Sequence, residues 1–164
     1  MSVREIVLWP DARLSAACAP VAEVTDAVRM QVTDMLETMY AAKGRGLAAP
    51  QIGVMNRVFV MDIGWKEGRS DPIVCINPII QDASKVFAVS DEGCLSIPGV
   101  TTSVRRPDQV QMVWTSPEGA RVVQAFTGFG AACVQHEMDH LDGVVTFDRL
   151  EPEARAQAEA EYMA

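Results

Sequence analysis

The stretch Gln135-His136-Glu137-Met138-Asp139-His140-Leu141 holds both histidines of this 164-residue chain. On a helix, residues four apart share a face, so the imidazoles of His136 and His140 can converge on one metal ion. Glu137 lies beside the first histidine, where its carboxylate can reach a water bound to that ion. The pattern His-Glu-x-x-His therefore predicts a helix that supplies two metal ligands and a general base, as a metal hydrolase needs. Histidines on apolar helix faces are commonly core residues, so the choice between a metal site and two core histidines depends on whether a third ligand is present elsewhere in the chain.

The composition is that of a single globular domain, residues 1–164, with 49% apolar and 22% charged residues. A net charge of −8 and a pI of about 4.7 argue against a nucleic-acid partner. Residues 1–10 do not resemble a signal peptide and no stretch approaches a membrane span, so we expect a cytoplasmic protein with reduced thiols. The four cysteines lack Cys-x-x-Cys spacing, which argues against a four-cysteine zinc site or a disulfide framework. We expect Cys18 and Cys75, in apolar surroundings, to be buried.

Apolar periodicity predicts helices at 24–43, 128–142 and 152–162. Thr25 is expected to cap the first helix, while Gly44 and Gly143 are expected to end the first and second. Strands are expected at 57–63, 72–80, 86–89, 110–114, 121–126 and 144–147. Residues 44–53, 64–71 and 91–99 should be irregular. This order of elements indicates an α+β fold with small antiparallel or mixed sheets packed around a central metal-binding helix, and with N- and C-terminal helices.

Two further segments carry candidate functional groups. In 91–99, Gly93 allows unusual backbone angles beside Cys94, whose thiolate could complete a Cys-His-His site with one position open to water. In 44–51, the glycine spacing does not match a phosphate loop, because no Gly-Lys-Ser/Thr follows. The amide of Gln51 could donate to an oxyanion. Taken alone, each segment is more simply explained as a turn: one with an incidental cysteine, the other a helix stop.

Together the three segments resemble the peptide deformylase family, and the resemblance covers nearly the whole chain. The family motifs Gly-x-Gly-x-Ala-Ala-x-Gln, Glu-Gly-Cys-x-Ser and Gln-His-Glu-x-Asp-His-Leu occur in this order at 44–51, 92–96 and 135–141. Three complete motifs in the correct order are very specific. The resemblance implies a metal-dependent hydrolase that removes the formyl group from the N-formyl-methionine start of new polypeptides.

The resemblance also implies a role for each site residue. Cys94, His136 and His140 would hold one divalent metal ion, Fe²⁺, with Zn²⁺, Ni²⁺ and Co²⁺ also accommodated, and water would fill the fourth position. Glu137 would take a proton from that water and later deliver it to the leaving amine. The oxyanion would be held by two donors, the Gln51 side chain and the Leu95 backbone N–H.

Several positions depart from the family pattern near the expected methionine pocket. Arg45, Ser90, Gly130 and Ala132 replace residues that are usually apolar or bulkier. We therefore expect methionine to be held less firmly, unless Phe129 refills the space, and Arg45 could instead reach a substrate carboxylate. Gly130 should also weaken the helix start, by about 1 kcal/mol relative to alanine. Residues 151–164 hold four glutamates and one arginine, so this tail offers no basic patch for ribosomal RNA.

Four functions compete. The first is a deformylase for N-formyl-methionyl peptides, and the second is a deformylase-like amidase for another small N-formyl or N-acyl compound. Neither has a nucleic-acid or membrane partner, although the first could meet its substrate at the ribosome. A metzincin peptidase is excluded, because its third histidine would stand where Thr146 does. A binding module with a structural metal is disfavoured, because such a site needs neither Glu137 nor Gln51.

Overall fold

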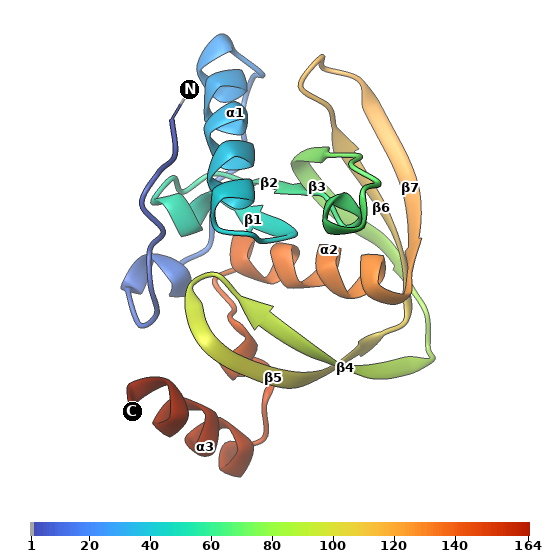
Figure 1. Ribbon diagram of the computed structural model, residues 1–164. Coiled ribbons are helices and arrows are strands. Elements are labelled where there is room, and N and C mark those ends of the chain that lie inside the picture. Colours follow the sequence, from blue (N-terminus) through green and yellow to red (C-terminus); the bar gives the residue numbers. More distant parts are fainter. Residues whose placement is uncertain (1) are drawn as a thin grey trace.

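The computed structural model describes residues 2–164, which form an antiparallel five-stranded sheet, a two-stranded sheet and three α-helices. Figure 1 shows α2 (Gly128–Leu141) at the centre, between the larger sheet and the two-stranded sheet. The other helices, α1 (Asp26–Ala41) and α3 (Pro152–Met163), lie at opposite ends of the molecule. The predicted α+β fold, with a central helix and helices near both ends of the chain, is confirmed.

The larger sheet is ordered β1-β2-β3-β6-β7, and the smaller pairs β4 with β5. The strands of the larger sheet are β1 (Gly46–Ala48), β2 (Val58–Met61), β3 (Ile73–Ala83), β6 (Gln109–Thr115) and β7 (Arg121–Thr127). The smaller sheet contains β4 (Phe87–Cys94) and β5 (Ile97–Pro107). Four 3₁₀ turns are present: η1 (Ala12–Ser15), η2 (Ala49–Ile52), η3 (Trp65–Glu67) and η4 (Thr146–Arg149). Since β1 is an edge strand, its outer side is free to face a ligand.

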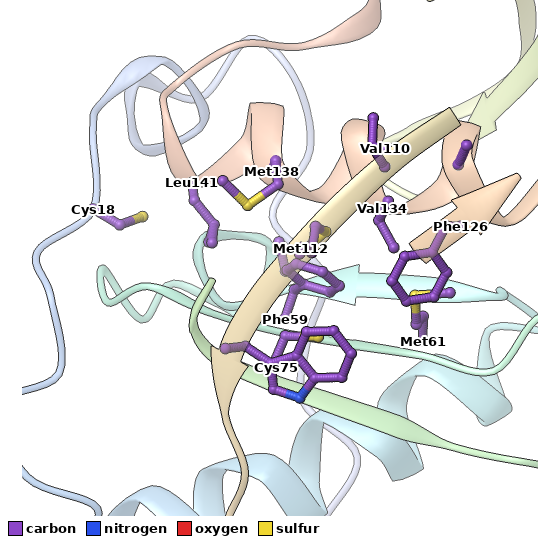
Figure 2. Close-up of a cluster of buried hydrophobic side chains, with 13 residues drawn as sticks. Cys18, Phe59, Met61, Cys75, Val110, Met112, Phe126, Val134, Met138 and Leu141 are labelled. Atoms are coloured by element: carbon purple, nitrogen blue, oxygen red, sulfur yellow. The ribbon is translucent and has the colours of Figure 1, made fainter. Parts of the chain in front are cut away.

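Strand β2 is buried on both faces because its side chains alternate between two cores. Phe59 and Met61 point toward α2 and join the cluster in Figure 2. Val58 and Val60 point the other way, into the core beneath α1. This double burial explains why the strand is a continuous apolar run. Predictions for the buried cysteines are also confirmed, since Cys75 is fully buried in the first core and Cys18 is 7% exposed.

The helix boundaries follow local sequence signals. The Thr25 side chain accepts a hydrogen bond from the Val28 N–H, so the predicted N-cap is confirmed. After α1, Lys43 rather than Gly44 adopts the left-handed conformation, with φ of 60°. At the end of α2, Gly143 has φ of 76°, as a residue that closes a helix should.

Three strand or loop predictions were wrong. Residues 91–99 are not irregular, because they end β4 and begin β5. Their pattern was hidden because the buried side of β5 carries the polar residues Thr102 and Arg106 between apolar ones. Residues 44–53 include the short strand β1 and η2. Residues 144–147 are not a strand; η4 forms there, where the Asp148 carboxylate accepts a hydrogen bond from the Val145 N–H.

The helices of residues 2–164 include none with the length and apolar character needed to cross a bilayer.

Candidate active site

Three side chains that could hold a metal ion, two from α2 and one from the end of β4, lie close together. Helical spacing puts His136 and His140 on one face, with ring centroids 5.0 Å apart. Cys94 ends β4, where a register shift after Gly93 breaks the regular pairing with β5, and such irregularities re-aim side chains. Its Sγ lies 3.5 Å from His140 Nε2, and the three donor atoms are all within 4.8 Å of one another. One thiolate and two imidazoles at this separation fit a single divalent ion.

The two imidazoles differ in their surroundings. His140 is deeply buried, and this desolvation lowers its pKa well below the ordinary value, so the ring stays neutral. Burial also disfavours charge on His136, but hydrogen bonds to Cys94 and Glu92 outweigh it and raise its pKa. Without an ion, these groups favour a proton on His136, so their surroundings stabilise positive charge. Metal binding at such a site displaces protons.

A buried ion-pair network contacts the Nδ1 side of the His136 ring. Glu92 Oε1 lies 3.0 Å from His136 Nδ1, which leaves Nε2 for a metal. Arg106 donates to both Glu92 oxygens, at 2.7 and 2.9 Å, and to Asp139 at 2.9 Å. Burial opposes charge on Glu92, but its hydrogen bonds to His136 and Arg106 prevail and lower its pKa. Sequence reasoning missed this network, because β5, whose alternation puts Arg106 on the buried side, was not recognised as a strand.

Glu137 is buried next to β1. Burial raises the pKa of its carboxyl to about 7. Its Oε1 finds no hydrogen-bond partner within residues 2–164, and the same is true of His140 Nδ1. A buried, unpartnered carboxylate oxygen is costly, which suits a group that must bind water or substrate. The carboxylate fits only because Gly46 has no side chain, since a Cβ there would lie 2.5 Å from Glu137 Oε2.

Gln51 and Leu95 lie next to Cys94. The Gln51 side-chain oxygen Oε1 accepts a hydrogen bond from the Ala48 N–H at 2.9 Å, which fixes the orientation of the side-chain amide. Its Nε2 then donates to Ser96 Oγ at 3.0 Å and lies 3.7 Å from Cys94 Sγ. Leu95 follows Cys94 in the turn between β4 and β5, and its side chain packs against Gly44. All six predicted site residues are thus brought together, with the Gln51 amide preorganised beside the candidate metal ligands.

Five of these six residues, all except the deeply buried His140, line a cleft of about 670 Å³, a volume that suits a small ligand or short peptide segment. Arg45, Ser90, Phe129 and Ala132 line it, as expected from the sequence. Gly130 does not line it, which corrects its predicted place at the pocket; Gly130 faces Ile63 and Phe126 instead. Helical periodicity turns residue 130 away from the face shared by 129, 132, 133 and 136.

The Arg45 side chain is already engaged. Its guanidinium pairs with Glu67 at 2.8 Å and lies over the Phe129 ring, 5.6 Å from the centroid. Arg45 and Phe129 therefore form one wall of the cleft, and the charge of Arg45 is balanced within the protein.

Comparison with known proteins identifies this arrangement. A family model described as polypeptide deformylase matches residues 3–156. The chain belongs to the peptide deformylase family. Curated relatives named peptide deformylase include one from Maricaulis maris, 41% identical over 96% of this chain and 91% of its own length. Another, from Alkalilimnicola ehrlichii, is 47% identical over 92% of this chain and 83% of its own length.

Solved peptide deformylases share the fold. The structure from Ehrlichia chaffeensis in complex with actinonin gives a TM-score of 0.92 at 38% identity, covering 98% of this chain and 96% of that one. The structure from Synechococcus elongatus, also with actinonin, gives a TM-score of 0.92 at 36% identity over 96% of this chain and 86% of that one. The protein is thus a metal-dependent deformylase, and the deformylase hypothesis is favoured over an amidase for another acyl group.

Replacing Gly46 with alanine should impair catalysis without unfolding the protein. The new Cβ would displace the Glu137 carboxylate, which is a flexible side-chain end, so the fold can absorb the change. Misplacing a reacting group by about 1 Å can cost roughly 10²-fold, and we expect a kcat loss of that order. Steady-state formate release together with thermal unfolding checks both expectations.

Gly130→Ala is the matched control. A Cβ there meets Ile63 and Phe126 at 3.5 Å, which is ordinary van der Waals contact. Because alanine favours a helix over glycine by about 1 kcal/mol, this variant should gain stability and keep its turnover. Parental turnover in Gly46→Ala would show that this glycine does not position Glu137.

Proposed function

We propose that this deformylase acts on N-formyl-methionyl peptides and that Cys94, His136 and His140 hold its single divalent metal ion. The observation that carries the proposal is the convergence of these three donors close to the buried Glu137, next to a peptide-sized cleft that Cys94, His136 and Glu137 line. A structural metal site would require neither a buried base nor an oriented amide.

Glu137, Gln51 and Leu95 each take part in the proposed reaction. When bound, the metal ion would lower the pKa of a coordinated water and polarise the formyl oxygen. Glu137 accepts a proton from the attacking water and then delivers it to the nitrogen of the leaving amine, so its own proton count is restored. Gln51 Nε2 and the Leu95 backbone N–H donate hydrogen bonds to the oxyanion as the formyl carbon becomes tetrahedral. The products are formate and a peptide with a free amino terminus.

We further propose Fe²⁺ as the native ion. A set of one thiolate and two imidazoles also suits Zn²⁺, Ni²⁺ and Co²⁺. A free thiol ligand persists in a reducing compartment, which supports a cytoplasmic location. We also propose that residues 1–164 work as one catalytic domain. The acidic helix α3 offers no basic patch for ribosomal RNA, so substrate delivery would not depend on it.

Cys94→Ala should abolish most metal binding. The change removes one of three protein ligands and the only anionic one, and each ligand of such a site is needed for tight binding. Plasma emission on the purified variant should give far less than one metal per chain. Cys133→Ala is the matched control, because this thiol lies in the cleft wall outside the ligand set. Full occupancy in Cys94→Ala would overturn the ligand assignment.

The function itself is tested by formate release from formyl-Met-Ala-Ser, with formyl peptides of other first residues measured alongside. We expect release from the methionine peptide, with a smaller preference for methionine than a tightly filled pocket would give. Ser90 and Ala132 leave space in the cleft, and each methylene lost from contact weakens apolar binding by about 0.8 kcal/mol. Phe129, 56% exposed in the cleft wall, can refill part of that space. No formate from any formyl peptide would refute the proposed function.

A further inference from the structure

The lysines of this acidic protein are concentrated at the catalytic cleft. The chain has a net charge of −8 and only three lysines, Lys43, Lys66 and Lys85. Lys43 and Lys66 both line the cleft, and both are exposed. The third, Lys85, is exposed in the turn between β3 and β4, away from the cleft. Most of the positive charge that this cleft offers to a ligand therefore comes from two side chains.

The two lysines carry charge that the protein does not balance. Among residues 2–164, neither has a carboxylate within ion-pair distance, whereas eight of the eleven arginines do, Arg45 included. Of the acidic groups of the cleft, Glu92 is paired with Arg106 and Glu137 is buried. Asp91 is exposed on β4 and keeps its charge, although it accepts a hydrogen bond from Ser103. An anionic group entering the cleft would therefore find uncompensated positive charge on one wall.

Specific contacts hold Lys66 near Lys43. The Trp65 indole N–H donates to the Gly44 carbonyl oxygen at 2.9 Å, which ties η3 to the loop that carries Lys43. On the other side of Lys66, Glu67 pairs with Arg45 in the same loop. Lys66 is thus flanked by two anchored neighbours. Its ammonium lies over the Trp65 ring, 5.8 Å from the centroid, and keeps its charge for a ligand.

The position of this pair relative to the reacting atoms sets which part of a substrate it can reach. Gly46 adjoins the Glu137 carboxylate, and Lys43 precedes Gly46 by three residues. Three residues span at most about 10 Å. An extended peptide advances about 3.3 Å per residue, so a substrate with its formyl group at Glu137 would bring its second or third residue near the lysines.

We propose that Lys43 and Lys66 form a subsite for a carboxylate carried one or two residues after the formylated residue of the substrate. The carboxylate belongs to an aspartate or glutamate side chain, or to the free C-terminus of a short formyl peptide. This inference rests on the proposed function and narrows its substrate class. It also replaces Arg45 as the residue expected to meet a substrate carboxylate, since Arg45 is paired with Glu67.

The test compares three formyl tripeptides on the metal-loaded enzyme: formyl-Met-Ala-Glu-amide, formyl-Met-Ala-Gln-amide and formyl-Met-Ala-Gln with a free C-terminus. Comparison of the glutamate amide with the glutamine amide isolates a side-chain carboxylate. Comparison of the two glutamine peptides isolates a terminal carboxylate. Because exposed ion pairs are individually weak, we expect kcat/KM to favour a carboxylate peptide by about three- to ten-fold at low salt, mainly through KM. The ratio of kcat/KM for the carboxylate peptide to kcat/KM for the neutral peptide should approach one in about 1 M salt, where charges are screened within a few ångströms.

The variants are Lys43→Asn and Lys66→Gln, separately and together. Asparagine suits position 43 because it tolerates the left-handed backbone found there. The double variant should lose the preference while keeping kcat on the neutral peptide, and Lys85→Gln should keep both. Equal kcat/KM for all three peptides in the parent, or a preference that survives the double change, would overturn the subsite.

A binding measurement separates this inference from the proposed function. Calorimetric titration with the unformylated peptides Met-Ala-Glu-amide and Met-Ala-Gln-amide requires no hydrolysis. Tighter binding of the glutamate peptide to the parent, lost in the double variant, supports the subsite even if no formyl peptide is hydrolysed. Indistinguishable binding of the two peptides would contradict it whatever the activity.

Discussion

Glu137→Gln should bind metal as the parent does and lose about 10²–10⁴-fold in kcat, the usual contribution of a general base. Glutamine fills the same space beside Gly46 and can still hydrogen-bond a water, but it cannot accept the proton of that water. The ligands Cys94, His136 and His140 are unchanged, so metal content should stay near one per chain. Steady-state formate release and metal analysis on the same preparation measure both quantities.

The pH profile makes this prediction sharper. Burial raises the pKa of Glu137 to about 7 in the metal-free chain, and a bound cation would lower it. A base acts only when deprotonated, so the kcat/KM of the parent should fall as the pH falls through a value at or below about 7. The residual activity of the variant should lack this acidic limb. Glu118→Gln, in the exposed turn between β6 and β7, is the control and should behave as the parent. Turnover of Glu137→Gln within a few-fold of the parent would remove Glu137 from the role of base.

The sequence was most informative where a local pattern and a ligand spacing coincide. His136 and His140 needed only the four-residue spacing of a helix, and the structure places both on α2 as predicted. The helix boundaries at Thr25 and Gly143 also followed from residues whose local preferences agree with the tertiary structure. At such positions the short-range signal is sufficient, because no distant contact has to override it.

The parts that were missed depend on pairing between distant residues. Arg106 looks like a surface arginine in the sequence, and only the proximity of Glu92 and Asp139 makes its burial stable. The same buried polar residue disrupted the apolar alternation by which β5 would have been recognised. Gly46 belongs to the glycine-spaced motif at 44–51, but that motif does not reveal what approaches it; its lack of a side chain matters because Glu137 comes from α2, 91 positions later in the chain.

Arg106→Met should destabilise the protein by about 3–5 kcal/mol, the usual cost of removing one partner from a buried ion pair. Arg106 is 5% exposed and is the guanidinium that both Glu92 and Asp139 share. Methionine fills similar space but leaves the buried Glu92 carboxylate without its guanidinium partner. Arg149→Met is the matched control, since Arg149 also binds Asp139 but its side chain is 47% exposed. Exposed pairs contribute about 1 kcal/mol or less, so urea unfolding should separate the two variants clearly.

The effect should also depend on pH. In the parent, the pKa of Glu92 is lowered on folding, because hydrogen bonds from His136 and Arg106 outweigh the burial that opposes its charge. A carboxyl with a lowered folded-state pKa contributes stability at neutral pH that is lost as the pH falls through that pKa. Without Arg106 this contribution is smaller, and the buried carboxyl can become neutral in acid. The difference in unfolding free energy between the parent and Arg106→Met should therefore shrink as the pH is lowered. A difference that stays constant with pH would mean that lost packing, rather than the lost partner of the Glu92 carboxylate, accounts for the destabilisation.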